Sequence, residues 1–185
     1  MSAKELSVKA LLTAMFFVLS MVSLNFGNMV ISFAGFPVIL AGLLYGPVGG
    51  MEVGLLGAFL EQAVKYGLTA TTFLWIIPPS LRGLVVGLYA SRVRCRITRR
   101  GLFLSMIAGA LCVTAANTAV MAADSIIYGY FSWQYVFGSL IFRILSGMLT
   151  SVLYLILSWP VLTRLSPVLG GRVRLADSPD GTDRG

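Results

Sequence analysis

A few ionisable and polar side chains interrupt long apolar stretches of this chain. Glu61 and Lys65 are four residues apart, Arg82 follows Pro78 and Pro79, and Asn117 and Arg143 lie within later apolar runs. In a membrane, each ionisable group costs roughly 2.5–3.5 kcal/mol or more unless it faces protein, a partner or water. These residues are therefore the first candidates for a functional site.

The charges predict a pocket for an anion. Lys65, Arg82 and Arg143 outnumber Glu61 and Asp124, and an arginine presents paired donors that match the two oxygens of a carboxylate. We expect Arg82 and Arg143 to hold the carboxylate, and Glu61, Lys65 and Asn117 to supply polar contacts. Flat surfaces for a ring could come from Trp75 and from further aromatic residues, namely Tyr66, Tyr128, Tyr130, Trp133 and Tyr135. Alternatively, the charges pair with one another to lock helices together, or Lys65 and Arg143 reach the membrane interface.

The elements that carry these residues are predicted to be transmembrane helices. Of the 185 residues, 57% are apolar and 11% are charged, against roughly 25% charged residues in a soluble domain. A crossing needs about 20 apolar residues, so the length allows roughly six helices. The apolar runs place them at residues 8–24, 31–45, 48–66, 78–93, 102–123 and 137–162.

The cationic residues predict the orientation of an all-α integral membrane bundle. Six alternating crossings put 11 of the 14 Lys and Arg residues on one side, which the positive-inside rule assigns to the cytoplasm. The topology is therefore N-in and C-in. We expect residues 1–167 to form one six-helix transmembrane substrate-binding domain, and residues 168–185 to be a disordered cytoplasmic tail because they lack apolar periodicity.

Several chemistries are excluded by the residues present. The chain has no histidine and two cysteines, so we expect no metal site, and we expect no cofactor. It has no G-x-x-x-x-G-K-[ST] phosphate loop, so any ATP hydrolysis belongs to a partner. The cationic cluster at residues 92–100 is expected to serve topology, with contact to anionic lipids as the alternative, rather than nucleic-acid binding. The chain is expected not to be an enzyme; the alternatives kept open are an intramembrane enzyme with Glu61 as acid or base, and a membrane sensor without cargo.

Small residues on the first helix predict a helix–helix contact. Ala10 and Ala14 lie on one face at a spacing that lets another helix approach closely. This contact could lie within the chain or with a partner subunit.

Two sequence stretches resemble a known family of membrane proteins. Residues 36–50 read FPVILAGLLYGPVGG and are followed by Leu81-Arg82-Gly83, after a basic start with Ala10 and Ala14. Together they resemble the S component of energy-coupling factor (ECF) vitamin transporters over residues 5–165, with folate-type members nearest. The resemblance implies a subunit that captures a vitamin or related micronutrient outside the cell, in the cytoplasmic membrane of a bacterium.

The resemblance also implies partners and moving parts. An S component docks on a transmembrane coupling subunit with two cytoplasmic ATPase subunits, and the family's alanine motif, here Ala10 and Ala14, meets the coupling subunit. Outer loops close the pocket in such proteins, which points to residues 25–35 and 67–78. The third helix carries Glu61-Gln62-x-x-Lys65 where a folate-type member is expected to carry an Asp-containing pattern. Folate, pantothenate and another carboxylate-bearing micronutrient therefore stay open as substrates.

Overall fold

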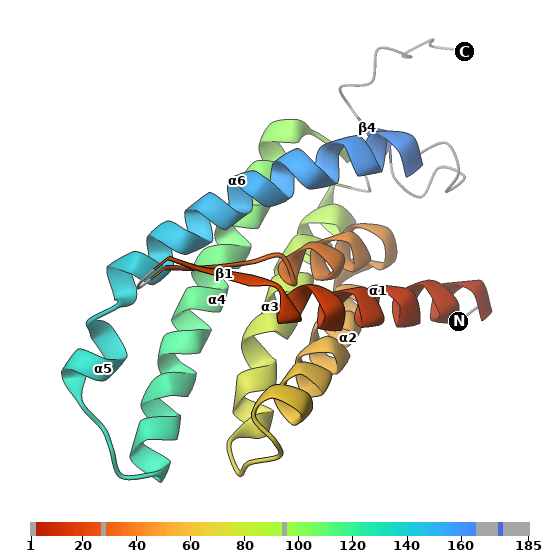
Figure 1. The fold of residues 1–185 in the computed structure, drawn as a ribbon. Coiled ribbons are helices and arrows are strands. Elements are labelled where there is room, and N and C mark those ends of the chain that lie inside the picture. Colours follow the sequence, from red (N-terminus) through yellow and green to blue (C-terminus); the bar gives the residue numbers. More distant parts are fainter. Residues whose placement is uncertain (1–2, 27–28, 94–95, 166–173, 176–185) are drawn as a thin grey trace, which may run out of the picture.

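The protein is a bundle of long helices with a β-hairpin near its N-terminus (Figure 1). The computed structural model describes residues 3–26, 29–93, 96–165 and 174–175. Its helices are α1 (Ala3–Met21), α2 (Gly35–Lys65), α3 (Thr72–Arg92), α4 (Arg99–Ile127), α5 (Trp133–Phe137) and α6 (Leu140–Leu165). The hairpin is β1 (Ser23–Phe26) with β2 (Met29–Ser32), and β3 (Arg96–Ile97) pairs in parallel with β4 (Arg174–Leu175).

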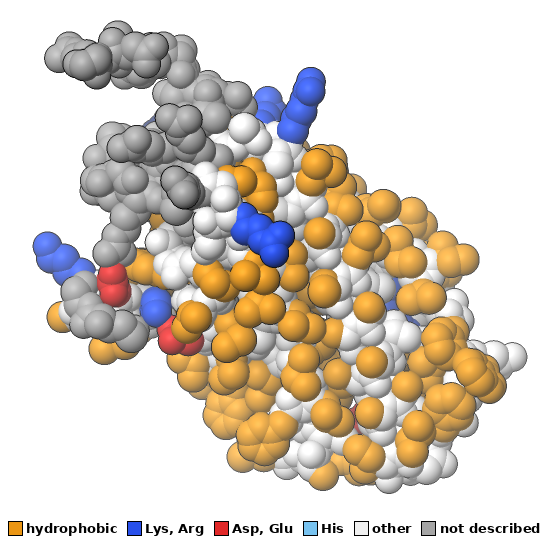
Figure 2. All heavy atoms as spheres, turned by 180° about the vertical axis from the view of Figure 1, so that it is seen from behind, with side chains coloured by type: hydrophobic (Ala, Val, Ile, Leu, Met, Phe, Trp, Pro, Cys, Tyr) orange, Lys and Arg blue, Asp and Glu red, His pale blue; other side chains and the backbone are white. Residues whose placement is uncertain are grey.

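Among the described residues, four stretches are long and apolar enough to cross a membrane, whereas the sequence predicted six crossings. They are Gly35–Lys65, Thr72–Arg92, Arg99–Ile127 and Trp133–Arg164. Lys and Arg side chains on one face gather mostly toward one end, whereas hydrophobic side chains cover much of the remainder (Figure 2). The expectation of a helical membrane protein is confirmed. The tail expected at residues 168–185 lies outside the described residues, apart from β4.

The long helix α2 consists of two segments that bend back on each other at Gly46. This residue has φ 75° and ψ −168°, a backbone conformation that favours glycine, and Pro47 then begins the second segment without needing an N–H partner. A Cβ placed on Gly50 would lie 2.8 Å from Gly42 Cα, although eight residues of continuous helix span about 12 Å. The division expected between residues 31–45 and 48–66 is therefore present as a sharp bend.

The helix α3 begins earlier than predicted. We expected Pro78 to open it, but Thr72 does, and Pro78 and Pro79 lie inside the helix. The Thr72 hydroxyl accepts the Thr69 N–H at 2.8 Å, and the Thr72 N–H donates to the Thr69 carbonyl at 3.2 Å. These two hydrogen bonds satisfy backbone groups just before and at the first residue of the helix. The outer loop expected at residues 67–78 is consequently reduced to residues 67–71.

Two other segments differ from the predicted pattern. Residues 23–26 and 29–32 pair as the strands β1 and β2 where the sequence predicted the end of a helix and a loop, because antiparallel pairing satisfies the backbone at this point. The last helix, expected at residues 137–162, is preceded by the one-turn helix α5 and begins at Leu140.

The helices pack in the order α1–α2–α3–α4–α6, and β2 also contacts α6. Glycines allow the closest approach, which is between α2 and α3. A Cβ on Gly83 of α3 would lie 2.2 Å from the Gly50 carbonyl oxygen of α2. Apolar residues of these helices form the core. Among them are Val38, Ile39, Leu43, Val86 and Leu102, which are at most 1% exposed.

The α2–α3 contact predicts an effect of glycine substitution. Gly83→Ala should lower the free energy of unfolding by about 1–3 kcal/mol because the new methyl group meets backbone rather than a movable side chain. Gly109→Ala on α4 is the matched control, since its Cβ would meet nothing closer than 3.8 Å. Thermal unfolding of both variants in detergent measures the difference, and equal transitions would contradict this account of the packing.

Candidate substrate-binding site

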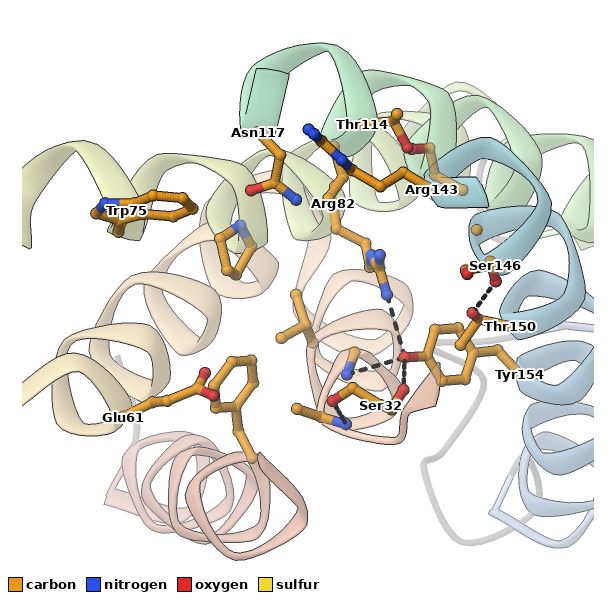
Figure 3. A pocket seen from close by; sticks show the side chains of 18 of the residues that line it. Ser32, Glu61, Trp75, Arg82, Thr114, Asn117, Arg143, Ser146, Thr150 and Tyr154 are labelled. Carbon is orange, nitrogen blue, oxygen red and sulfur yellow. Dashed lines mark hydrogen bonds between the residues drawn. The ribbon is translucent and has the colours of Figure 1, made fainter. Parts of the chain in front are cut away.

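A cavity of about 440 Å³ lies between the helices, beside the end of the hairpin, within the range of roughly 300–1,000 Å³ usual for small-molecule sites. Its lining comes from α1, β2, α2, α3, α4 and α6, with polar side chains converging on one space (Figure 3). The lining residues are Phe16, Ser32, Ala34, Gly35, Val38, Glu61, Trp75, Pro79, Arg82, Ala110, Val113, Thr114, Asn117, Met121, Arg143, Ser146, Gly147, Thr150 and Tyr154.

Five of the six residues expected from the sequence to form the site line this cavity. They are Glu61, Trp75, Arg82, Asn117 and Arg143. The sixth, Lys65, is absent from the lining: its ammonium group donates to the Ser20 carbonyl oxygen and to Glu61 Oε1, the latter at 2.8 Å. Lys65 thus joins the end of α1 to α2 and neutralises the acid of the cavity.

The two arginines are held by neutral groups. Arg82 Nη1 donates to the Tyr154 hydroxyl at 3.1 Å. Arg143 donates from Nε and Nη2 to the Ser139 hydroxyl, from Nη2 to the Val136 carbonyl at 2.9 Å, and from Nη1 to the Thr118 hydroxyl at 3.4 Å. Within the part of the chain that the structure describes, no carboxylate oxygen lies within 4.0 Å of either guanidinium. The cavity therefore holds two positive charges that no acidic group among the described residues pairs.

Near the C-terminal end of α4, Asp124 contacts the Trp75 side chain. Trp75 Nε1 donates to Asp124 Oδ1 at 3.4 Å, and the Tyr130 hydroxyl donates to Asp124 Oδ2. That hydrogen bond raises the pKa of the Tyr130 phenol above its usual value, so Tyr130 stays protonated and continues to donate. Asp124 therefore joins α4 to the start of α3 and to the loop that follows α4.

The other aromatic residues proposed as ring surfaces do not line the cavity. Tyr66, Tyr128, Tyr130, Trp133 and Tyr135 are exposed, between 44% and 71%, and such side chains suit a membrane interface. Their sequence positions near helix ends could not separate the two roles. The aromatic rings of the cavity belong to Trp75, Phe16 and Tyr154.

Sequence reasoning also missed several hydroxyl groups. On α6, the residues that line the cavity recur at intervals of three or four from Arg143 onward: Ser146, Gly147, Thr150 and Tyr154. This interval keeps side chains on one helix face, so the stripe could have been found once Arg143 was chosen. Thr114 could have been found in the same way, three residues before Asn117. Ser32 belongs to the hairpin, which the sequence did not predict, although it falls within residues 25–35, which the family resemblance assigned to a loop over the pocket.

The chain is similar to known transporter subunits. A family described as the S component of the ECF-type riboflavin transporter matches residues 1–163. The chain belongs to this family. It is therefore a membrane-embedded transporter subunit and not an enzyme, which confirms the resemblance seen in residues 36–50 and 81–83. The family description names riboflavin, whereas the sequence pattern placed folate-type members nearest.

Solved structures show the same fold. The S component of a bacterial ECF transporter aligns with a TM-score of 0.63 at 22% identity, covering 88% of this chain and 97% of the other. The S component for biotin from an ECF-type ABC transporter aligns with a TM-score of 0.52 at 20% identity, covering 85% and 94%.

Curated relatives match only a short segment. UPF0397 proteins of Streptococcus pneumoniae are 46% identical over 56 residues, which is 30% of this chain and 29% of theirs. The UPF0397 protein of Lactobacillus johnsonii is 38% identical over 50 residues, or 27% and 26%. The match thus spans under a third of the length of these relatives.

Proposed function

We propose that this S component captures a vitamin-sized molecule with an acidic group from outside a bacterial cell. The supporting observation is the pair of guanidinium groups, Arg82 and Arg143, in a cavity whose single acid, Glu61, is already paired with Lys65. A guanidinium binds a carboxylate more strongly than a neutral carbonyl because the hydrogen bonds are charge-assisted. Trp75 supplies a flat surface at the side of the cavity.

The candidate substrates differ in how they would use this charge. Folate, pantothenate and biotin carry carboxylates, and biotin is named for one structural relative. Riboflavin, named for the family, is neutral and offers ring carbonyls that an arginine could also bind through hydrogen bonds. The uncompensated charge favours the acidic molecules, and riboflavin is the alternative that the binding test must include.

Arg82→Ala is predicted to weaken binding of the carboxylate substrate by tenfold or more, because hydrogen bonds to charged groups contribute about 1.5–3 kcal/mol. Arg92→Ala is the matched control, since Arg92 lies on the same helix, is exposed and does not line the cavity. Titration calorimetry of the purified chain with folate, pantothenate, biotin and riboflavin measures both. Tight binding of riboflavin alone would overturn the acidic substrate, and unchanged affinity in the Arg82 variant would remove that residue from the site.

The proposed topology is six crossings with both termini in the cytoplasm. The bend at Gly46 divides α2 into two segments, and α1 is a 19-residue helix with Lys4 and Lys9 near its start. Together with α3, α4 and α6 these make six helical segments. The cationic groups of residues 92–100 and of Arg164 then fall on the side of Lys4 and Lys9, in accordance with the positive-inside rule.

This topology predicts the fate of reporter fusions. A fluorescent protein joined to either terminus should fold and emit in the cytoplasm, and an alkaline phosphatase inserted between Gly67 and Leu68 should be active in the periplasm of a Gram-negative host. The arrangement would be contradicted if a fluorescent protein at the C-terminus did not emit while an alkaline phosphatase fused at the same terminus was active.

The proposed partners are a transmembrane coupling subunit and two cytoplasmic ATPases, which membership in the family suggests. Ala10 and Ala14 are exposed on α1 and line an apolar groove of about 540 Å³ together with Leu56 and Leu60 of α2. Small side chains at this spacing allow a helix of another subunit to approach closely. The groove is therefore the proposed docking face for the coupling subunit.

Replacing Ala10 and Ala14 with leucine should preserve ligand binding by the isolated chain but abolish uptake, because the larger side chains fill the groove. Uptake of labelled substrate by cells that contain the coupling subunit and ATPases is the measurement. Leu11→Ala is the control, since Leu11 lies on the same helix and outside the groove. Normal uptake by the leucine variants would contradict the proposal that the coupling subunit docks at Ala10 and Ala14.

A further inference from the structure

The hydroxyl group of Tyr154 joins three separate segments at the cavity wall. It accepts a hydrogen bond from the Gly35 N–H at 3.2 Å and from Arg82 Nη1 at 3.1 Å, and it donates to the Ser32 carbonyl at 2.5 Å (Figure 3). A phenol has one donor and two acceptor sites, so this hydroxyl is fully used. The side chain is 2% exposed, which removes competition from solvent.

The Tyr154 hydroxyl is also the single hydrogen-bond partner of the Arg82 side chain within the described residues. The guanidinium carbon lies 5.3 Å from the centre of the Tyr154 ring, close enough for a cation–π contact. The other N–H groups of Arg82 are free of protein partners in the described part of the chain and are available to a ligand. Tyr154 thus sets where the guanidinium points without consuming its capacity to bind an acid.

Arg143 offers a contrast that makes this role specific. Within the described residues it donates to three groups: the Val136 carbonyl of α5, the Ser139 hydroxyl between α5 and α6, and the Thr118 hydroxyl of α4. Its position depends on several groups, so loss of one leaves the others in place. Arg82 has no such redundancy.

Close packing at Gly35 tightens the same arrangement. A Cβ at this position would lie 2.1 Å from Arg82 Nη1 and 2.7 Å from the Tyr154 hydroxyl oxygen. The first turn of α2, the arginine and the tyrosine therefore fit together only because residue 35 has no side chain. A shift of one of the three must shift the others.

We infer that Tyr154 is the positioning residue that aims Arg82 at the acidic group of the substrate and couples that contact to the junction between β2 and α2. The inference rests on the proposed function, because it assigns Arg82 its ligand. When the acid draws the guanidinium toward it, the Tyr154 hydroxyl carries the strain to Ser32 and Gly35. Occupancy of the cavity is thereby communicated to the end of the hairpin.

The test is Tyr154→Phe, which keeps the ring and removes the hydroxyl. Titration with folate, pantothenate and biotin should show about tenfold weaker binding of whichever carboxylate the wild-type chain binds. In an Arg82→Ala background the same change should have little further effect, because a positioning residue acts through the arginine. Tyr45→Phe is the matched control, since Tyr45 is half-buried outside the cavity.

A second readout needs no ligand. Amide hydrogen exchange in peptides covering residues 31–36 should become faster in Tyr154→Phe and stay unchanged in Tyr45→Phe, because the Gly35 N–H loses its acceptor. If the wild-type chain binds a carboxylate, but Tyr154→Phe binds it equally well and exchanges at the wild-type rate, the inference fails and the proposed function stands. Failure of the wild-type chain to bind any of the three carboxylates overturns both. If the losses of binding free energy in Arg82→Ala and Tyr154→Phe simply add in the double variant, Tyr154 contacts the ligand directly and is not a positioning residue.

Discussion

Holding a positive charge inside an apolar bundle is the constraint on which the rest of this structure depends. A charged side chain at the centre of a membrane helix costs roughly 2.5–3.5 kcal/mol, and several times that where no water or polar group can reach it. In the part of the chain that the structure describes, hydroxyl and carbonyl oxygens rather than carboxylates meet this cost for Arg82 and Arg143. Neutral partners solvate the charge but leave it uncancelled, so an anion that enters the cavity gains the full electrostatic attraction.

The packing of the helices follows from the same need. Arg82 reaches Tyr154 across the bundle only if α3 lies close to the start of α2, and glycines at positions 42, 50, 83 and 87 allow that approach. The bend at Gly46 brings both segments of α2 against α3, so that Gly35 at one end and Glu61 at the other border one cavity. A side chain at any of these close contacts would separate the elements that carry the polar groups.

The sequence predicted the ionisable residues of the cavity because ionisable groups are conspicuous in apolar surroundings. Arg82, Arg143 and Glu61 could be found without a structure, and a helical bundle follows from composition alone. Tyr154 could not be found in this way, since one tyrosine in an apolar helix resembles any interfacial aromatic residue until its three hydrogen-bond partners are known. Lys65 was misplaced for a related reason: its i,i+4 pairing with Glu61 was visible, but the Ser20 carbonyl that draws it away from the cavity was not.

Helix α1 connects the two halves of the proposed function. Its Lys9 pairs with Glu52 at 2.5 Å, and near its other end the Ser20 carbonyl accepts from Lys65, so α2 holds it at two points. Between these two contacts, Phe16 lines the cavity and packs against Gly57, whereas Ala10 and Ala14 line the apolar groove. Because these two contacts hold α1 against α2, Phe16 and the alanine pair lie at a fixed spacing on one helix. A substrate in the cavity and a coupling subunit at the proposed docking face would therefore contact opposite sides of the same helix.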